Sequence, residues 1–206
     1  MNHLRTIPLA ALSSSSILGP ALALAGCAGT PGEPKVQLGF AGQELSASVC
    51  PAKVPAALTP AADQKLMATL TGVGVQIYVC AATSSGYAWT FTAPQAKLYD
   101  ASSTLRGTHF AGPTWQALDG SSVKGAKVAS AAAPIPGAIP WLLLTAVAQG
   151  GSGVTSIQRL STIGGVAPAT GCDASAIGAT TQVPYTAQYY FYETTVGQTG
   201  KLRCGG

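Results

Sequence analysis

Charged side chains are scarce in this sequence of 206 residues. Asp, Glu, Lys and Arg make up 9% of the chain, against roughly 25% in ordinary soluble domains. The 11 basic residues outnumber the 7 acidic ones, but they are scattered singly, as Lys53, Lys97, Lys124 and Arg159 illustrate. Without a basic stripe the chain lacks the electrostatic footprint of a nucleic-acid-binding protein, so we expect no nucleic-acid partner.

Recognisable catalytic and cofactor motifs are also missing. There is no Gly-x-Ser-x-Gly turn for a serine nucleophile and no Cys-x-x-Cys pair for a metal. Gly72-Val73-Gly74 is not followed by a third glycine that opens a helix, which argues against a dinucleotide-binding fold. We therefore expect no cofactor and no metal.

A long uninterrupted apolar run is the third absence. Arg5 is followed by an uncharged stretch from Ile7 to Ala25, but four serines and Pro20 interrupt it. The stretch is therefore short of the roughly 20 apolar residues that cross a bilayer, and its layout is that of a secretory signal. It ends in Leu24-Ala25-Gly26-Cys27, which looks like a bacterial lipobox whose cysteine becomes the lipidated first residue of the mature protein.

We therefore predict a lipoprotein-type signal peptide over residues 1–26 and a lipid-carrying Cys27 at the start of a flexible tether, 27–49. The alternative is ordinary cleavage after Ala25, which would release a soluble periplasmic or secreted protein. Lipidation of Cys27 leaves an even number of cysteines, whereas soluble release leaves an odd thiol in an oxidising compartment. The lipid would anchor the protein in the cell membrane, and Ala28 favours the outer membrane if the host has two.

Residues 50–206 are predicted to form a single β-rich domain. Thr59-Pro60 offers a helix cap, and the apolar residues after it fit helical spacing, so we expect one short helix near 60–70. From Val73 to Val79 apolar residues alternate with other residues, which is typical of a half-buried strand. The apolar run Trp141–Ala148 predicts a strand buried on both faces. About eight or more short strands at this spacing indicate an antiparallel β-sandwich or barrel.

Seven groups of residues occur in order between about 52 and 195 and carry a family resemblance. They are Gly74–Cys80, Gly107–Trp115, Asp119–Ser121, Ile139–Leu144, Ile157–Arg159, Gly164–Pro168 with Gly171–Ala174, and Tyr189–Tyr192. In these motifs the chain resembles a family of secreted proteins of unknown function found in bacteria and fungi. The resemblance implies an extracytoplasmic location and a β-rich domain, and it brings no established activity.

Four cysteines remain after the lipobox, and in an oxidising compartment they are expected to form two disulfides in one of three pairings. Cys80 and Cys172 lie inside the family-like motifs, whereas Cys50 and Cys204 lie at the two ends of the domain. We therefore pair Cys80 with Cys172 and Cys50 with Cys204. The long spacings and a single histidine beyond the signal argue against a metal site.

That histidine, His109, has two interpretations. It is either an acid/base group or ligand near Asp119, Arg159 and Asp173, or a structural group that holds the loop beside Trp115. We favour the structural role.

Aromatic residues suggest a second kind of site. Trp89, Trp115 and Trp141 can line a cleft for a carbohydrate or a small apolar ligand, although tryptophans in a domain of this size are more often core. On the last strand, Tyr190 and Tyr192 share one face and Tyr189 takes the other, so we expect one of these rows to be exposed.

The candidate pocket residues are therefore His109, Trp115, Asp119, Trp141, Arg159 and Asp173. Two functions compete for them. The first is an envelope-anchored, non-enzymatic module that binds a ligand or partner or has a structural role. The second is an extracytoplasmic enzyme of unknown reaction centred on His109 and Asp119.

Overall fold

The computed structural model describes residues 50–51, 53–149, 152–195 and 203–205. The predicted signal peptide, the lipid site Cys27 and the tether 27–49 lie outside the described residues. None of the helical turns within the described ranges is long and apolar enough to span a bilayer.

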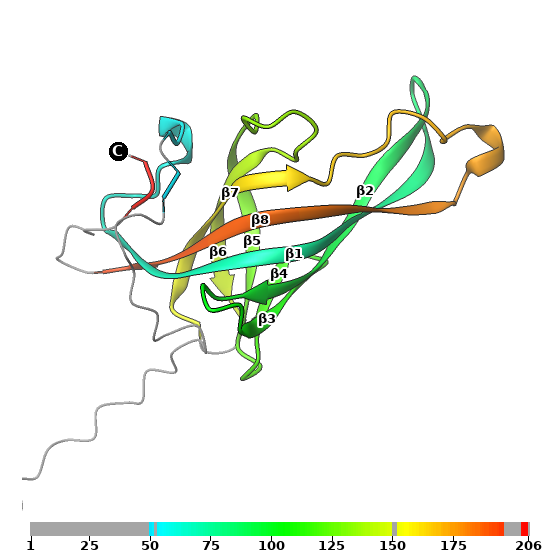
Figure 1. Cartoon of the computed structure of the whole chain (residues 1–206). Coiled ribbons are helices and arrows are strands. Elements are labelled where there is room, and N and C mark those ends of the chain that lie inside the picture. Colours follow the sequence, from blue (N-terminus) through cyan, green and yellow to red (C-terminus); the bar gives the residue numbers. More distant parts are fainter. Residues whose placement is uncertain (1–49, 52, 150–151, 196–202, 206) are drawn as a thin grey trace, which may run out of the picture. The chain divides into compact units, whose positions relative to one another are not determined.

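Eight strands and two short 3₁₀ turns make up the described domain (Figure 1). In chain order they are η2 (Ala56–Leu58), β1 (Gln64–Thr83), β2 (Gly86–Tyr99), β3 (Leu105–Phe110), β4 (Thr114–Ala117), β5 (Ser122–Ala131), β6 (Trp141–Ala148), β7 (Val154–Gly164), η3 (Ala174–Ala176) and β8 (Thr180–Thr194). Each strand pairs antiparallel with the next, and β8 pairs with β1 to close a barrel. The predicted antiparallel β fold is confirmed, and it is a barrel rather than a sandwich.

The helix predicted near residues 60–70 is wrong, because this segment runs into β1. Leu66, Ala68 and Leu70 also alternate with a period of two, and each is 1% exposed. A bulge between Leu66 and Ala68 turns Leu66 to the outer side of the sheet, where it joins a different apolar cluster from Ala68 and Leu70. Pairing along β8 and burial on both sides therefore override the local helical spacing.

The barrel interior holds the larger of the two apolar clusters. Its largest members are Trp115, Tyr185, Tyr189 and Phe191, packed with aliphatic residues such as Leu98 and Ile157. Gly72 makes room for one of them: a Cβ there would lie 2.5 Å from Cε2 of Tyr189. The absence of a side chain at this position therefore lets a tyrosine ring fill the space beside β1.

The second cluster lies under a strap formed by residues 50–51, 53–60 and 203–205. It contains Leu58, Leu66, Trp141, Leu160, Tyr190, Tyr192 and Cys204. Cys50 and Cys204 form a disulfide that joins the two parts of the strap, and η2 contacts β5 and β6. The strap thereby covers an apolar outer face that the barrel alone would leave in water (Figure 1).

Gln158 of β7 fastens this strap from beneath. Its side chain is fully buried, and its Nε2 donates to the carbonyl oxygens of Leu58 (2.6 Å) and Cys204 (2.9 Å). Its Oε1 accepts from the hydroxyl of Tyr192 at 2.5 Å. Both polar atoms of the Gln158 amide are therefore hydrogen-bonded, so this buried side chain carries no unsatisfied polar atom.

Two expectations about exposure are wrong because of the strap and the barrel wall. Both tyrosine rows of β8 are buried: Tyr189 faces the interior, while Tyr190 and Tyr192 lie under the strap. The strand Trp141–Ala148 exists as β6, but it is not buried on both faces, since Val147 is 64% exposed. The strap covers only part of the outer face, so β6 is exposed where it leaves that cover.

The second disulfide ties a long loop to the β1–β2 hairpin, which extends away from the barrel at the right of Figure 1. Cys80 bonds to Cys172, and Nε1 of Trp89 donates to the carbonyl of Thr170 at 2.9 Å. Both expected disulfides are therefore present in the structure. Because disulfides persist in oxidising compartments, they indicate an extracellular or periplasmic location.

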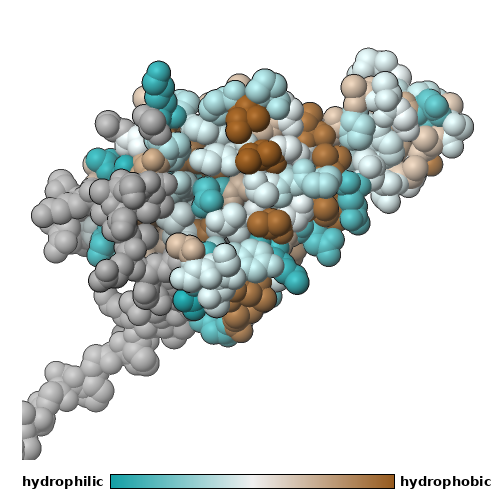
Figure 2. Space-filling view, viewed as in Figure 1, coloured by the Kyte–Doolittle hydropathy of each residue, from teal (hydrophilic) through white to brown (hydrophobic). Residues whose placement is uncertain are grey.

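The surface reflects the low charge content of the sequence. Figure 2 shows several small apolar groups separated by weakly polar residues on this face. Exposed apolar side chains in the described ranges include Phe91, Val128, Val147, Ile163 and Ile177.

Candidate functional site

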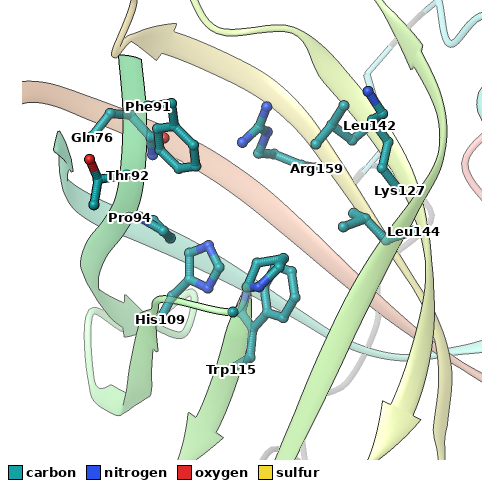
Figure 3. Close-up of a pocket in the computed structure, with 12 residues that line it drawn as sticks. Gln76, Phe91, Thr92, Pro94, His109, Trp115, Lys127, Leu142, Leu144 and Arg159 are labelled. Carbon is teal, nitrogen blue, oxygen red and sulfur yellow. The ribbon is translucent and has the colours of Figure 1, made fainter. Parts of the chain in front are cut away.

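A cavity of about 290 Å³ is formed by residues from β1 to β7 and the β3–β4 turn. The lining residues are Gln76, Phe91, Thr92, Pro94, His109, Gly112, Pro113, Trp115, Lys127, Leu142, Leu144 and Arg159 (Figure 3). The volume lies at the lower end of the range for ligand pockets, roughly 300–1,000 Å³. The cavity is therefore of a size for one small molecule.

The wall is mostly apolar, with a few polar groups. Phe91, Pro94, Pro113, Leu142 and Leu144 supply aromatic, proline and aliphatic surface. None of the described residues that line the cavity is Asp or Glu, while two, Lys127 and Arg159, are cationic. This combination of apolar area and a few polar atoms is typical of small-molecule sites.

His109 and Trp115 form one side of the cavity. They are cross-strand partners on β3 and β4, so their side chains point to the same face of the sheet. The rings stack with centroids 4.2 Å apart and an interplanar angle of 11°. Figure 3 shows the two rings side by side, with Arg159 on the far side of the cavity.

The protonation state of His109 follows from its surroundings. Its Nδ1 lies 2.8 Å from the carbonyl oxygen of Thr114, which can only accept, so Nδ1 carries the proton. The pKa of His109 is lowered to about 3, mainly by burial; the hydrogen bond to Thr114 opposes this change, and the nearby charge of Arg159 adds to it. The imidazole is therefore neutral at physiological pH and a weak base.

Arg159 extends into the cavity from β7. Its Nη2 and Nε donate to the carbonyl oxygen of Pro140 at 2.8 and 3.2 Å. Burial lowers the pKa of Arg159, and the phenols of Tyr189, Tyr185 and Tyr78 oppose that change. A guanidinium starts from a pKa above 12, so the group stays charged. Within the described ranges the single ion pair is Arg106–Asp100, so Arg159 has no acidic partner there.

Two further donors at the cavity are buried without a hydrogen-bond partner among the described residues. They are Nε2 of Gln76, whose residue is 2% exposed, and Nε1 of Trp115, whose residue is 1% exposed. An unpaired buried donor costs roughly 1–3 kcal/mol. The cavity thus presents N–H groups that a bound molecule can satisfy.

Of the six candidate pocket residues, His109, Trp115 and Arg159 line this cavity, and the other three lie elsewhere. Oδ1 of Asp119 accepts from the backbone nitrogen and the hydroxyl of Ser121 in the β4–β5 turn. Asp173 caps η3, where its carboxylate accepts from Ser175, and those hydrogen bonds lower its pKa. Trp141 is buried under the strap.

The proposed three-tryptophan cleft is not formed either. Trp115 is inside the barrel, Trp141 is under the strap, and Trp89 lies on the β1–β2 hairpin against Thr170. Among the described residues, no three His, Cys, Asp or Glu side chains come together as metal ligands.

Sequence reasoning missed several lining residues, Gln76 above all. In β1 the branched residues Val73, Val75, Ile77 and Val79 occupy the outer, partly exposed face. Gln76 and Tyr78 take the interior face instead, at 2% and 7% exposure. The sequence shows that Gln76 lies on the opposite face of the strand from these branched residues, but it does not show that this face is the interior of a closed barrel.

The comparisons with known proteins give a family and no activity. A family model described as a protein of unknown function, DUF3455, matches residues 60–193, which include all eight strands except the last residue of β8. No curated protein and no solved structure matches the chain.

Proposed function

The chain belongs to the DUF3455 family of unknown function, and we propose that its barrel is a non-enzymatic module that binds one small, largely apolar molecule. The observation that carries this proposal is the cavity of about 290 Å³, with apolar walls and two buried donors that make no hydrogen bond to any described residue. A packed barrel of this size has no structural need for unpaired donors beside an open volume. A bound molecule supplies both the missing contacts and the missing acceptors.

The enzyme hypothesis centred on His109 and Asp119 receives little support from this geometry. Asp119 does not line the cavity, and the Nδ1 proton of His109 is directed to a backbone carbonyl. A general base works best with a pKa near the operating pH, whereas that of His109 is about 3. No acidic side chain among the described lining residues is placed to assist it.

A carbohydrate is also less suited to this cavity than an apolar ligand. Sugar rings stack on aromatic faces that are open to solvent, with many polar groups around them. Here one face of Trp115 is covered by His109, and the residue is 1% exposed. The rest of the wall is mainly aliphatic and aromatic.

The lipobox sequence supports a location for this activity. We propose that the signal peptide is removed, that Cys27 carries the lipid, and that the tether holds the barrel near the membrane surface. In a host with two membranes Ala28 favours the outer one. The disulfides agree with export but do not distinguish anchored from soluble protein.

An uncharged dye tests the binding proposal. N-phenyl-1-naphthylamine fluoresces strongly in apolar sites, and we expect saturable binding of one dye per barrel. Leu142→Trp, at a half-buried lining position, fills the cavity and should abolish binding. Val147→Trp is the matched control, because it lies on the same strand, is 64% exposed and is not a lining residue. Melting temperatures establish that both variants are folded; equal dye binding by the two would contradict the proposal.

A further inference from the structure

We propose that the ligand of this cavity is an organic anion, a small apolar molecule with one carboxylate-like group that binds the guanidinium of Arg159. This inference rests on the proposed binding function and names the chemical class that the site accepts. It comes from the charges, hydrogen bonds and burial around Arg159.

The first observation is an uncompensated positive charge. Arg159 is half-buried and lines the cavity, and the acidic residues of the described ranges do not form an ion pair with it. Lys127, an exposed lining residue on β5, adds a second positive charge. Taking a charge partly out of water is costly unless it is paired, so an anion is the complement that this site lacks.

The second observation is the donor capacity that remains on Arg159. A guanidinium has five N–H groups in a planar fork that matches a carboxylate. One N–H on Nε and one on Nη2 are used by the Pro140 carbonyl, and the side chain also interacts with the hydroxyl of Tyr189. At least two N–H groups remain, while the contacts to Pro140 and Tyr189 fix the position of the group.

The third observation is that the other polar groups nearby also favour an acceptor. Gln76 is buried and lines the same cavity; its side chain interacts with the hydroxyl of Tyr185, but its Nε2 makes no hydrogen bond of standard geometry in the described ranges. Figure 3 shows Gln76 and Arg159 extending toward each other from opposite sides. The hydroxyl of Tyr78, by contrast, already donates to the carbonyl of Gly165. An anionic oxygen between Gln76 and Arg159 would accept from both.

The remaining wall residues determine the polarity of the rest of the ligand. Phe91, Pro94, Trp115, Leu142 and Leu144 present apolar surface and leave little to hydrogen-bond the far end of a molecule. A polyanion such as a phosphorylated sugar would bury charges that this wall cannot match. A monoanion with an aromatic or branched aliphatic body fits both halves of the cavity.

Competition with N-phenyl-1-naphthylamine tests the anion directly. The competitors are 4-isopropylbenzoate and 4-isopropylbenzamide, which have the same body with and without a charge near pH 7. We expect the benzoate to displace the dye at a concentration about 10-fold or more below that of the amide, from about 1.5–3 kcal/mol for a charged hydrogen bond. Arg159→Gln should remove this difference, and Arg159→Lys should keep part of it.

Lys124→Gln serves as the control, because it removes a positive charge from an exposed residue of β5 that does not line the cavity. We expect displacement of the dye by the benzoate to be unchanged. Equal displacement by acid and amide, or displacement by neither while the dye still binds, would overturn the anion assignment and leave the binding function standing. Failure of the dye itself to bind would instead contradict the proposed function.

Discussion

His109 and Trp115 stack face to face inside the barrel, 4.2 Å apart between ring centroids. Each comes from a different strand, and the Nδ1 proton of His109 is held by the carbonyl of Thr114. The pair joins β3 to β4 and forms one wall of the cavity. The histidine therefore makes the kind of loop contact expected of a structural group, and it also contributes surface to the candidate site.

Replacing His109 should change how stability depends on pH. The folded pKa of His109 is about 3, below the value of 6.5 in an unfolded chain, so the unfolded state binds a proton first as the pH falls. The wild type should therefore lose about 2 kcal/mol of its free energy of unfolding between pH 7 and pH 5 that His109→Phe does not lose. Urea unfolding at the two pH values measures this difference.

His109→Phe keeps an aromatic ring beside Trp115 and cannot titrate, which isolates the protonation effect. Carboxylates with lowered pKa values, such as Asp100 and Asp173, are present in both proteins and cancel in the comparison. Parallel pH profiles for the two proteins would show that His109 is not buried in its neutral form.

Gln158→Leu should destabilise the strap strongly. The change leaves the carbonyl groups of Leu58 and Cys204 and the hydroxyl of Tyr192 without the amide that satisfies them. At about 1–3 kcal/mol for each unpaired group, the free energy of unfolding should fall by about 3 kcal/mol or more. Tyr192→Phe removes one hydroxyl and should cost less. Equal losses in denaturant unfolding would mean that Gln158 does not organise the strap.

Removal of the disulfide between Cys80 and Cys172 should lower the free energy of unfolding by about 2–5 kcal/mol. The bridge joins residues 92 apart in sequence and holds the 165–179 loop to the β1–β2 hairpin. Cys80→Ser with Cys172→Ser tests this by urea unfolding, and peptide mapping of the unreduced wild type should recover the linked pair. Free thiols at both positions in exported protein would refute the assignment.

Cys27→Ser should abolish lipidation and move the exported protein from the membrane fraction to the soluble fraction. The expected wild-type mass includes the lipid on Cys27, and that of the variant does not. Fractionation and intact mass together provide the measurement. An unchanged membrane fraction with unchanged mass would rule out the lipid anchor and favour release of soluble protein.

The β fold was largely predictable because many of its strands show an alternation of apolar and other residues. The helix near 60–70 was mispredicted because Leu66, Met67 and Leu70 fit a helical period. In the structure these residues belong to β1, and a bulge between Leu66 and Ala68, which the local sequence does not reveal, shifts the pairing register with β8. For β8, the sequence predicted that Tyr189 and Tyr190 lie on opposite faces, but it did not predict that both faces are buried. Tyr189 is buried by closure of the barrel and Tyr190 by the strap, and neither depends on local sequence.

The candidate site was less predictable, since it depends on which residues meet across the barrel. His109, Trp115 and Arg159 were singled out as rare residue types, and the barrel brings these three to one cavity. Asp119 and Asp173 have equally rare side chains, but turn hydrogen bonds to Ser121 and Ser175 explain them locally. A rare residue type marks a candidate for the site, but only the closed barrel shows which candidates line the cavity and which belong to turns.

The decisive experiment is a crystal structure of the protein with 4-isopropylbenzoate. We expect the carboxylate within hydrogen-bond distance of Arg159 and the amide of Gln76, with the isopropylphenyl group between Trp115 and Leu144. A fully occupied ligand outside the barrel, or one inside it with the carboxylate turned away from Arg159, would refute anion binding in this cavity.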